Sequence, residues 1–261
     1  MSQELLSKLN TSHIEEISSS RNEPDWLKDY RKNSLSVYDN LPIETSPLYN
    51  KYTDAKKMDP EKVSLSTTTT ETVPSFLEKR LSELENEICI IQIGTNIHKI
   101  NLPDELKSKG LVISSISDAI QNNSELVKKA LEASNSNDDR FTALNNAAFN
   151  SGIFIHVPRN LILEKPIHFL TCLSEDGHST ISRNIVFADE SSKSTLIQEL
   201  YSPNIQTQQA YLELMNTNVG PNAQLDVTTL QMLDQNAVTF STKRTDLGQD
   251  AKVNWYSGLF G

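Results

Sequence analysis

A repeated stretch near the C-terminal end constrains the fold of this chain most strongly. The segment VGPNAQLDVTTLQ begins at Val219 and LGQDAKVNWYSGL begins at Leu247, so the second copy follows the first at an offset of 28 in the numbering. The turn residues of the two copies match in kind: Gly220, Asn222 and Ala223 in the first, and Gly248, Asp250 and Ala251 in the second. A fixed period with turn residues and alternating side chains is what a parallel β-helix requires, because each coil stacks on the previous one.

Other strand-like runs surround this repeat. From Ile153 onward the sequence consists of short alternating segments, rich in Val, Ile, Leu, Phe and Thr and separated by turn residues. A weaker third copy places Ser194 and Leu196 opposite Ala223 and Leu225, at an offset of 29 in the numbering. Such strands also permit a sandwich or a barrel, and an antiparallel meander can imitate the repeat. The repeat favours a parallel β-helix.

The first 152 residues follow a different pattern. Residues 1–55 are predicted to form an N-terminal helical segment, and residues 75–152 an α/β region. Between them, residues 56–74 include four consecutive threonines and offer no apolar face, so we expect a flexible linker there. With residues 153–261 as the β-helix, the predicted fold class is an α+β N-terminal region followed by a predominantly β, parallel β-helix.

Local signals place individual elements in these regions. In the helical segment, Pro24 suits the first turn of a helix whose apolar stripe includes Trp26 and Leu27. In the α/β region, Ser75 begins a short amphipathic helix, and EICIIQIG follows as a strand. A second helical pattern is predicted to begin at Ser117.

The composition argues against several classes of function. The formal net charge of −10 opposes a phosphate backbone, and no basic patch is visible in the sequence, so we expect no nucleic-acid partner. No apolar run approaches the roughly 18 residues that span a bilayer, and MSQELLSKLN is not a secretory signal, so we expect a cytoplasmic protein with no membrane partner. Cys89 and Cys172 are far apart and fit a reducing compartment, and Cys89 is expected in the core.

Long ordered segments of the chain resemble the SufB/SufD family of iron-sulfur cluster assembly proteins. The resemblance is carried by EPDWLKDYR, by ALNNAAFNSGIFIHVPRNLILEKPIHFL, and by the stretch from QLDVTTLQ through FSTKRTDLGQDAKVNWYSGLFG. It covers nearly the whole chain. TSPLYNKYTD is similar to the SufD branch, as is the LQML at residues 230–233, where we associate an Ile-Gln-Asn-Trp pattern with SufB.

The resemblance implies a scaffold rather than an enzyme, with a right-handed β-helix at its core. The implied partners are a SufB-like protein and a SufC-like ATPase. It further implies that this chain binds no cofactor firmly and that the iron-sulfur cluster forms on the assembled complex. A β-helix that stops at Gly261 would expose its last coil, so we expect the C-terminal part, including the SufC-docking region, to lie beyond residue 261.

Three polar residues are candidates for the interior of the β-helix: Gln231, Lys243 and Arg244. The resemblance implies that polar side chains in this part of SufB line a route for sulfur, and Gln231 and Lys243 occupy the matching positions. By alternation, Gln231 is expected to be an inward amide with a structural role, whereas Lys243 shares its face with Thr239 and Ser241 and is expected to point to water. Arg244 is the better inward candidate, unless a register slip reverses the two.

Two other functions are compatible with the sequence. A carbohydrate-active β-helix enzyme would need paired carboxylates, for which Asp226 and Asp234 are the nearest candidates. A protein-interaction module would use the side of the β-helix as a docking edge. His168, Cys172 and His178 could bind a metal, but their spacing is loose and no fourth ligand is near, so we assign neither metal ligands nor catalytic residues.

Overall fold

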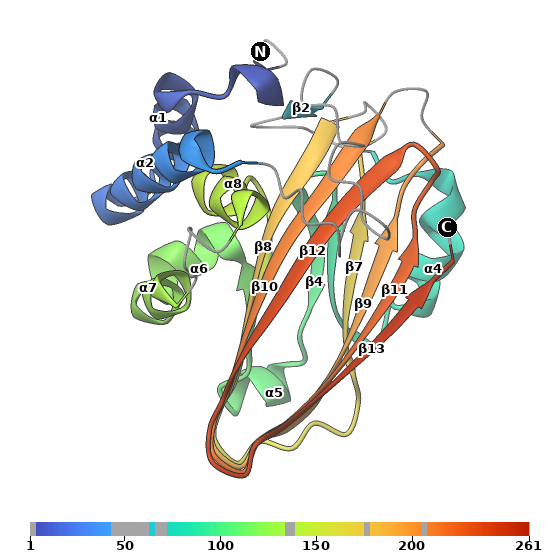
Figure 1. Cartoon of the computed structure of the whole chain (residues 1–261). Helices are drawn as coiled ribbons and strands as arrows, with labels where there is room; N and C mark the ends of the chain where they lie inside the picture. Colours follow the sequence, from blue (N-terminus) through green and yellow to red (C-terminus); the bar gives the residue numbers. More distant parts are fainter. Residues whose placement is uncertain are drawn as a thin grey trace.

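The computed structural model describes residues 4–42, 63–65, 72–133, 139–174, 178–204 and 208–260. A mixed α/β region precedes a β-solenoid (Figure 1). The elements of the first region are β1 (Glu4–Leu5), η1 (Leu6–Lys8), α1 (Thr11–Ser20), α2 (Asp25–Asn40), β2 (Ser64–Leu65), η3 (Ser75–Leu77), α4 (Glu78–Glu83), β3 (Ile88–Ile93), β4 (Asn96–Asn101), α5 (Asp104–Ser108), β5 (Val112–Ser115), α6 (Ile116–Asn122), α7 (Ser124–Glu132) and α8 (Arg140–Ala148). The elements of the solenoid are β6 (Ile153–Val157), β7 (Ile167–Cys172), β8 (His178–Ala188), β9 (Lys193–Tyr201), β10 (Gln209–Val219), β11 (Gln224–Met232), β12 (Ala237–Leu247) and β13 (Lys252–Leu259).

Two sheets face each other in the solenoid. Strands β8, β10 and β12 run parallel within a seven-stranded sheet, and β7, β9, β11 and β13 run parallel within a six-stranded sheet. One coil is formed by β8 and β9, the next by β10 and β11, and a third by β12 and β13 (Figure 1). The predicted parallel arrangement is therefore confirmed, and the antiparallel meander is excluded.

The spacing between coils differs along the chain. Gln224 pairs with Lys252 of the next coil, at an offset of 28 in the numbering, and with Lys193 of the previous coil, at an offset of 31. The connection from β9 to β10 has seven residues (202–208), whereas that from β11 to β12 has four (233–236). These three additional residues account for the longer spacing. The offset of 29 predicted for the earlier copy is therefore wrong by two residues.

The turn residues of the repeat meet two separate requirements. A positive φ recurs at one non-glycine residue in each turn: Asn160 (63°), Ser191 (59°), Asn222 (57°) and Asp250 (57°). Asparagine and aspartate tolerate this conformation better than most residues. The repeat glycines are required by close stacking, because a Cβ atom would lie 2.7 Å from the Glu190 nitrogen at Gly220 and 2.6 Å from the Pro221 nitrogen at Gly248.

Both faces of the seven-stranded sheet are covered by protein. Helices α2 and α8 lie against its outer face, to the left of β8, β10 and β12 in Figure 1. Phe141 of α8 stacks on Phe240 of β12 with ring centroids 3.9 Å apart. A second buried cluster, which includes Val186, Met215 and Leu225, fills part of the space between the two sheets. Apolar residues are therefore needed on both sides of this sheet.

Two details of the N-terminal region differ from the prediction. The helical pattern expected from Ser117 is divided into two helices: Ser115 caps α6, and Asn123, with φ −130°, separates α6 from α7. Most of the predicted linker, residues 56–74, lies outside the described residues. Within its described part, β2 pairs with β1 and β8, and Val63 is fully buried. That short part is held against the sheet.

An ionic cluster attaches α4 to the outer face of the six-stranded sheet. Arg80 donates two hydrogen bonds to Glu199 of β9, at 2.9 and 2.7 Å, and a third to Glu83 at 2.8 Å. The Tyr201 hydroxyl donates to Glu199 at 3.0 Å, and His168 Nδ1 lies 3.5 Å from the same carboxylate. Burial raises the pKa of Glu199, but the contact with His168, the hydrogen bonds from Arg80 and the Arg80 charge outweigh burial and lower the pKa to about 2.

This cluster predicts an acid-sensitive contribution to stability. Because the folded-state pKa of Glu199 is depressed, its contribution is present above the ordinary pKa of 4.5 and is lost as the pH falls toward about 2. We expect Glu199→Gln to be less stable than the wild type at pH 6, with a difference that narrows steadily between pH 5 and pH 2. Urea unfolding across this range measures it. Glu83→Gln is the control, because this carboxylate is half exposed and its loss should cost less than about 1 kcal/mol.

Candidate functional site

A polar cluster lies between the two sheets, inside the solenoid, and Glu213 of β10 is at its centre. The Glu213 carboxylate accepts hydrogen bonds from Asn184 Nδ2 at 2.7 Å, from the Tyr211 hydroxyl at 3.3 Å and from Ser241 Oγ at 2.6 Å. Gln198 Nε2 donates a further hydrogen bond to it. Four donors from β8, β9, β10 and β12 thus converge on one carboxylate.

A hydrogen-bond chain connects this carboxylate with Lys243 of β12. Thr229 Oγ1 donates to Gln198 Oε1 at 2.9 Å and accepts from Lys243 Nζ at 2.5 Å. The Lys243 ammonium also lies 5.1 Å from the centroid of the Trp255 ring, within the range of a cation–π contact. Lys243 therefore reaches from the seven-stranded sheet to residues of β11 and β13 on the opposite wall.

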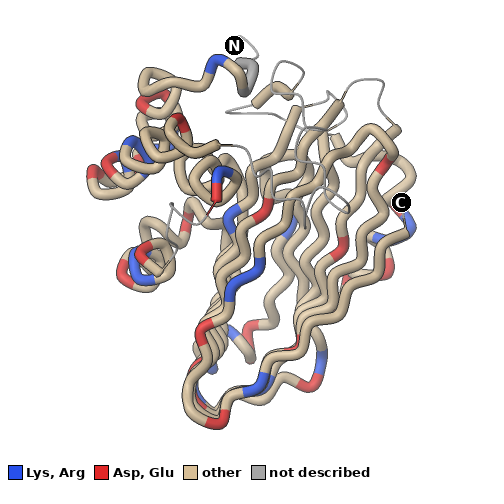
Figure 2. Tube along the Cα trace, viewed as in Figure 1, with Lys and Arg blue, Asp and Glu red and all other residues tan. Residues whose placement is uncertain are grey.

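The inner part of the cluster is shielded from water, whereas Ser241 is exposed and Lys243 is partly buried. Glu213 is 3% exposed, and Asn184, Gln198 and Tyr211 are fully buried. Burial, together with the Glu213 charge, raises the pKa of Tyr211 well above its ordinary value, so this hydroxyl stays protonated and donates. Burial lowers the pKa of Lys243, and the Glu213 charge opposes that change. Charged residues are otherwise sparse along the strands and are concentrated on the helices and turns (Figure 2).

The structure reverses the predicted orientations of Lys243 and Arg244. Lys243 points into the solenoid, as its contact with Thr229 shows. Arg244 shares its strand face with Phe240, which packs on α8, and lies close enough to Tyr30 of α2 to affect its pKa. The prediction assumed that the polar face of β12 points to water. Because helices cover the outer face, the apolar residues of β12 face the helices and its polar residues face the interior.

Gln231 occupies a partly buried position two residues after Thr229 in β11. It is in register with Leu200 of β9 and Leu259 of β13. Alternation places it on the same face as Thr229, toward the interior. The structure thus brings Gln231 and Lys243 to the interior face of neighbouring coils and places Arg244 behind the sheet.

The central residues of the site were not predicted from the sequence. Glu213 lies within AYLELMNT, where it reads as an isolated charge in an apolar strand. Asn184, Gln198 and Tyr211 likewise lie in strands with apolar neighbours. A useful signal was present, since a charged residue flanked by leucines in a buried strand needs partners that satisfy it.

The other candidate residues are not brought together. Asp226 lies in β11 and Asp234 two residues beyond its end, with roughly 20 Å of strand between them, too far for a pair of glycosidase carboxylates. His168 belongs to the six-stranded sheet and His178 begins β8 in the other. In the described part of the chain, no three His, Cys, Asp or Glu residues are grouped to hold a metal. Cys89 is fully buried, as predicted, and burial raises the pKa of its thiol.

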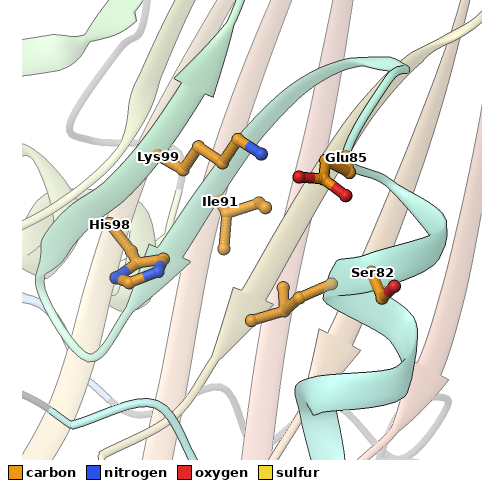
Figure 3. Close-up of a pocket in the computed structure, with 6 residues that line it drawn as sticks. Ser82, Glu85, Ile91, His98 and Lys99 are labelled. Atoms are coloured by element: carbon orange, nitrogen blue, oxygen red, sulfur yellow. The ribbon is translucent and has the colours of Figure 1, made fainter.

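A surface cavity of about 250 Å³ lies beside α4 (Figure 3). Ser82 and Glu85 line it from α4 and the following turn, His98 and Lys99 line it from β4, and Ile91 of β3 contributes to its floor. The Lys99 side chain extends toward Glu85 across this cavity (Figure 3). Ser82, Glu85 and His98 are exposed, so water competes for each polar group. The interior cluster is consequently the stronger candidate site.

These features define a class of protein: a parallel β-solenoid with a polar, carboxylate-centred interior and a helical N-terminal region. Two family models match the chain. The model described as the SufBD protein N-terminal region matches residues 6–169, and the model described as the SUF system FeS cluster assembly, SufBD core domain, matches residues 171–261. The chain therefore belongs to the SufBD family of iron-sulfur cluster assembly proteins.

Curated relatives agree with this family. An iron-sulfur cluster assembly SufBD family protein of Staphylococcus aureus (strain MRSA252) is 26% identical over 264 residues. A protein of the same description from Staphylococcus saprophyticus is 24% identical over 269 residues. Each match covers 97% of this chain and 57% of the relative, so the chain spans a little over half the length of these relatives.

Proposed function

We propose that this chain is a non-catalytic scaffold component of a SufBCD-type iron-sulfur cluster assembly complex. In this proposal it is SufD-like, pairs with a SufB-like protein in the cytoplasm and acts with a SufC-like ATPase. The observation that carries the proposal is the match of the two family models, in order, to residues 6–169 and 171–261. The iron-sulfur cluster is the cargo of the complex, and this chain contributes a surface on which the complex assembles.

Two structural features support a scaffold role. The coils are tied by parallel pairing across both sheets, which gives a rigid body of the kind that solenoid proteins use for binding. The interior carboxylate of Glu213 is occupied by four hydrogen-bond donors, so it is poorly placed to act as a general base or as a metal ligand.

Among the described helices, none is both long enough and apolar enough to cross a membrane.

Co-expression with candidate partners tests this proposal. The tagged chain would be co-expressed anaerobically with a SufB-like protein and a SufC-like ATPase and purified through its tag. We expect a stoichiometric complex that survives gel filtration. Retention of neither partner would contradict the scaffold proposal and leave a general interaction module, whereas cleavage of oligosaccharides by the isolated chain would support a carbohydrate-active enzyme instead.

A further inference from the structure

The hydrogen-bond chain inside the solenoid has a defined direction. A carboxylate only accepts hydrogen bonds, so the amide of Gln198 must turn its NH₂ group toward Glu213. Its carbonyl oxygen then faces Thr229 and accepts from the threonine hydroxyl at 2.9 Å. With its hydrogen directed to Gln198, Thr229 offers a lone pair to Lys243 Nζ at 2.5 Å.

We infer that Glu213 is a positioning residue for Lys243: through Gln198 and Thr229 it fixes the ammonium in place beside Trp255, at the interior of the last coil. The donor at each link is determined by the acceptor before it, beginning with the carboxylate. Reversal of any link would place two donors or two acceptors face to face, which is costly in a buried site.

The surroundings of Glu213 explain why it can set this direction. Its other donors, Asn184, Tyr211 and Ser241, are neutral, so they satisfy its oxygens without cancelling its charge. Among the described residues that form this cluster, Tyr211 and Glu213 of β10 and Lys243 of β12 are titratable. The other members are Asn184 of β8, Gln198 of β9, Thr229 of β11, Ser241 of β12 and Trp255 of β13. Lys243 is therefore the cation that responds to the Glu213 charge.

The rate at which the Lys243 amine is acylated reports on this arrangement. Only the neutral amine reacts, and the negative charge of Glu213 favours the ammonium. In Glu213→Gln, which keeps the shape of the side chain, we expect the acylation rate of Lys243 at pH 8 to rise by at least about threefold, with its pH profile moved to lower pH. Mass spectrometry of the full chain after a short pulse of reagent measures the rate. Exposed Lys252 of β13 is the internal reference and should not change.

Variants of Thr229 separate positioning from a purely structural role. Thr229→Val removes the hydroxyl and should also raise the Lys243 rate, whereas Thr229→Ser keeps the hydroxyl and should leave it unchanged. If the effect of Glu213 on Lys243 passes through the hydrogen bonds of Gln198 and Thr229, Glu213→Gln should raise the Lys243 acylation rate by a smaller factor in the Thr229→Val background than in the wild type. If Glu213→Gln raised the Lys243 acylation rate by the same factor in the Thr229→Val background as in the wild type, Glu213 would act on Lys243 through space alone. That result would overturn the positioning role.

Two results decide the inference even if one variant is damaged. An unchanged Lys243 rate in a folded Glu213→Gln protein, checked by circular dichroism, would overturn it. If that variant does not fold, equal Lys243 rates in Thr229→Val and Thr229→Ser would overturn it instead. The inference deepens the account of the interior site, and only its meaning for cluster assembly rests on the proposed function. Its readout needs no partner, so it and the co-purification experiment can fail independently.

Discussion

Replacing Gly152 with alanine is expected to lower the free energy of unfolding by about 3 kcal/mol or more. Gly152 lies just before β6 with a φ of 141°, in a region that favours glycine. A Cβ atom there would lie 1.9 Å from the carbonyl oxygen of Arg183 and 2.8 Å from its nitrogen. Both are backbone atoms of β8, so no side chain can move aside. The substitution must separate β6 from β8 or deform the start of the solenoid.

Chemical denaturation of Gly152→Ala, followed by far-UV circular dichroism, measures this loss. Gly110→Ala is the matched control, because Gly110 also has a positive φ, of 91°, but its nearest neighbour is a Pro158 side-chain carbon at 3.5 Å. The control reports the cost of holding alanine at a positive φ without a backbone clash, which is about 1–3 kcal/mol. Equal losses in the two variants would show that β6 does not approach β8 closely enough to exclude a Cβ atom.

Replacing Arg31 with methionine is expected to cost about 3–5 kcal/mol, the range for breaking a buried ion pair from one side. Arg31 of α2 is fully buried and donates to both Glu23 oxygens, at 2.8 and 2.7 Å. It also donates to the Ala147 carbonyl oxygen of α8 at 3.1 Å and lies 3.7 Å from the centroid of the Phe149 ring. In the variant, the Glu23 side chain would be 3% exposed as in the wild type, and Ser18 Oγ at 3.1 Å would be its remaining side-chain hydrogen-bond donor among the described residues.

A neighbouring ion pair provides the control for this variant. Lys32 and Glu15 are joined at 2.6 Å, but their side chains are 33% and 47% exposed. Lys32→Met should therefore cost less than about 1 kcal/mol. If Arg31→Met and Lys32→Met gave similar midpoints of urea unfolding, α2 could not be anchored on α8 through Arg31.

Much of the fold could be predicted from local patterns. The recurrence of glycine and asparagine or aspartate identified the coils, because the stacking distance and the left-handed turn restrict those positions. The helix after Pro24 was predicted by its apolar stripe. The preceding helix, α1, lies within the predicted helical segment of residues 1–55, but its own bounds were not predicted. Asn10 accepts hydrogen bonds from the nitrogens of Ser12 and His13, a capping signal that can be recognised in a sequence.

The interior site was harder to predict, for a physical reason. Alternation shows which residues of a strand share a face, but it does not show which face is covered. For β12 the apolar face was assigned to the interior, whereas helices from the N-terminal region cover it and Lys243 occupies the interior. The partners of Glu213 lie up to 29 residues away from it in the sequence, so no local pattern could connect them.

The proposed role in cluster assembly can be tested by iron and acid-labile sulfide analysis. The SufB-like and SufC-like partners would be purified anaerobically with this chain and, in parallel, without it. We predict that iron and sulfide are retained in equal amounts when the chain is present and fall severalfold when it is omitted. Equal iron and sulfide contents in the two preparations would contradict the role assigned to this protein.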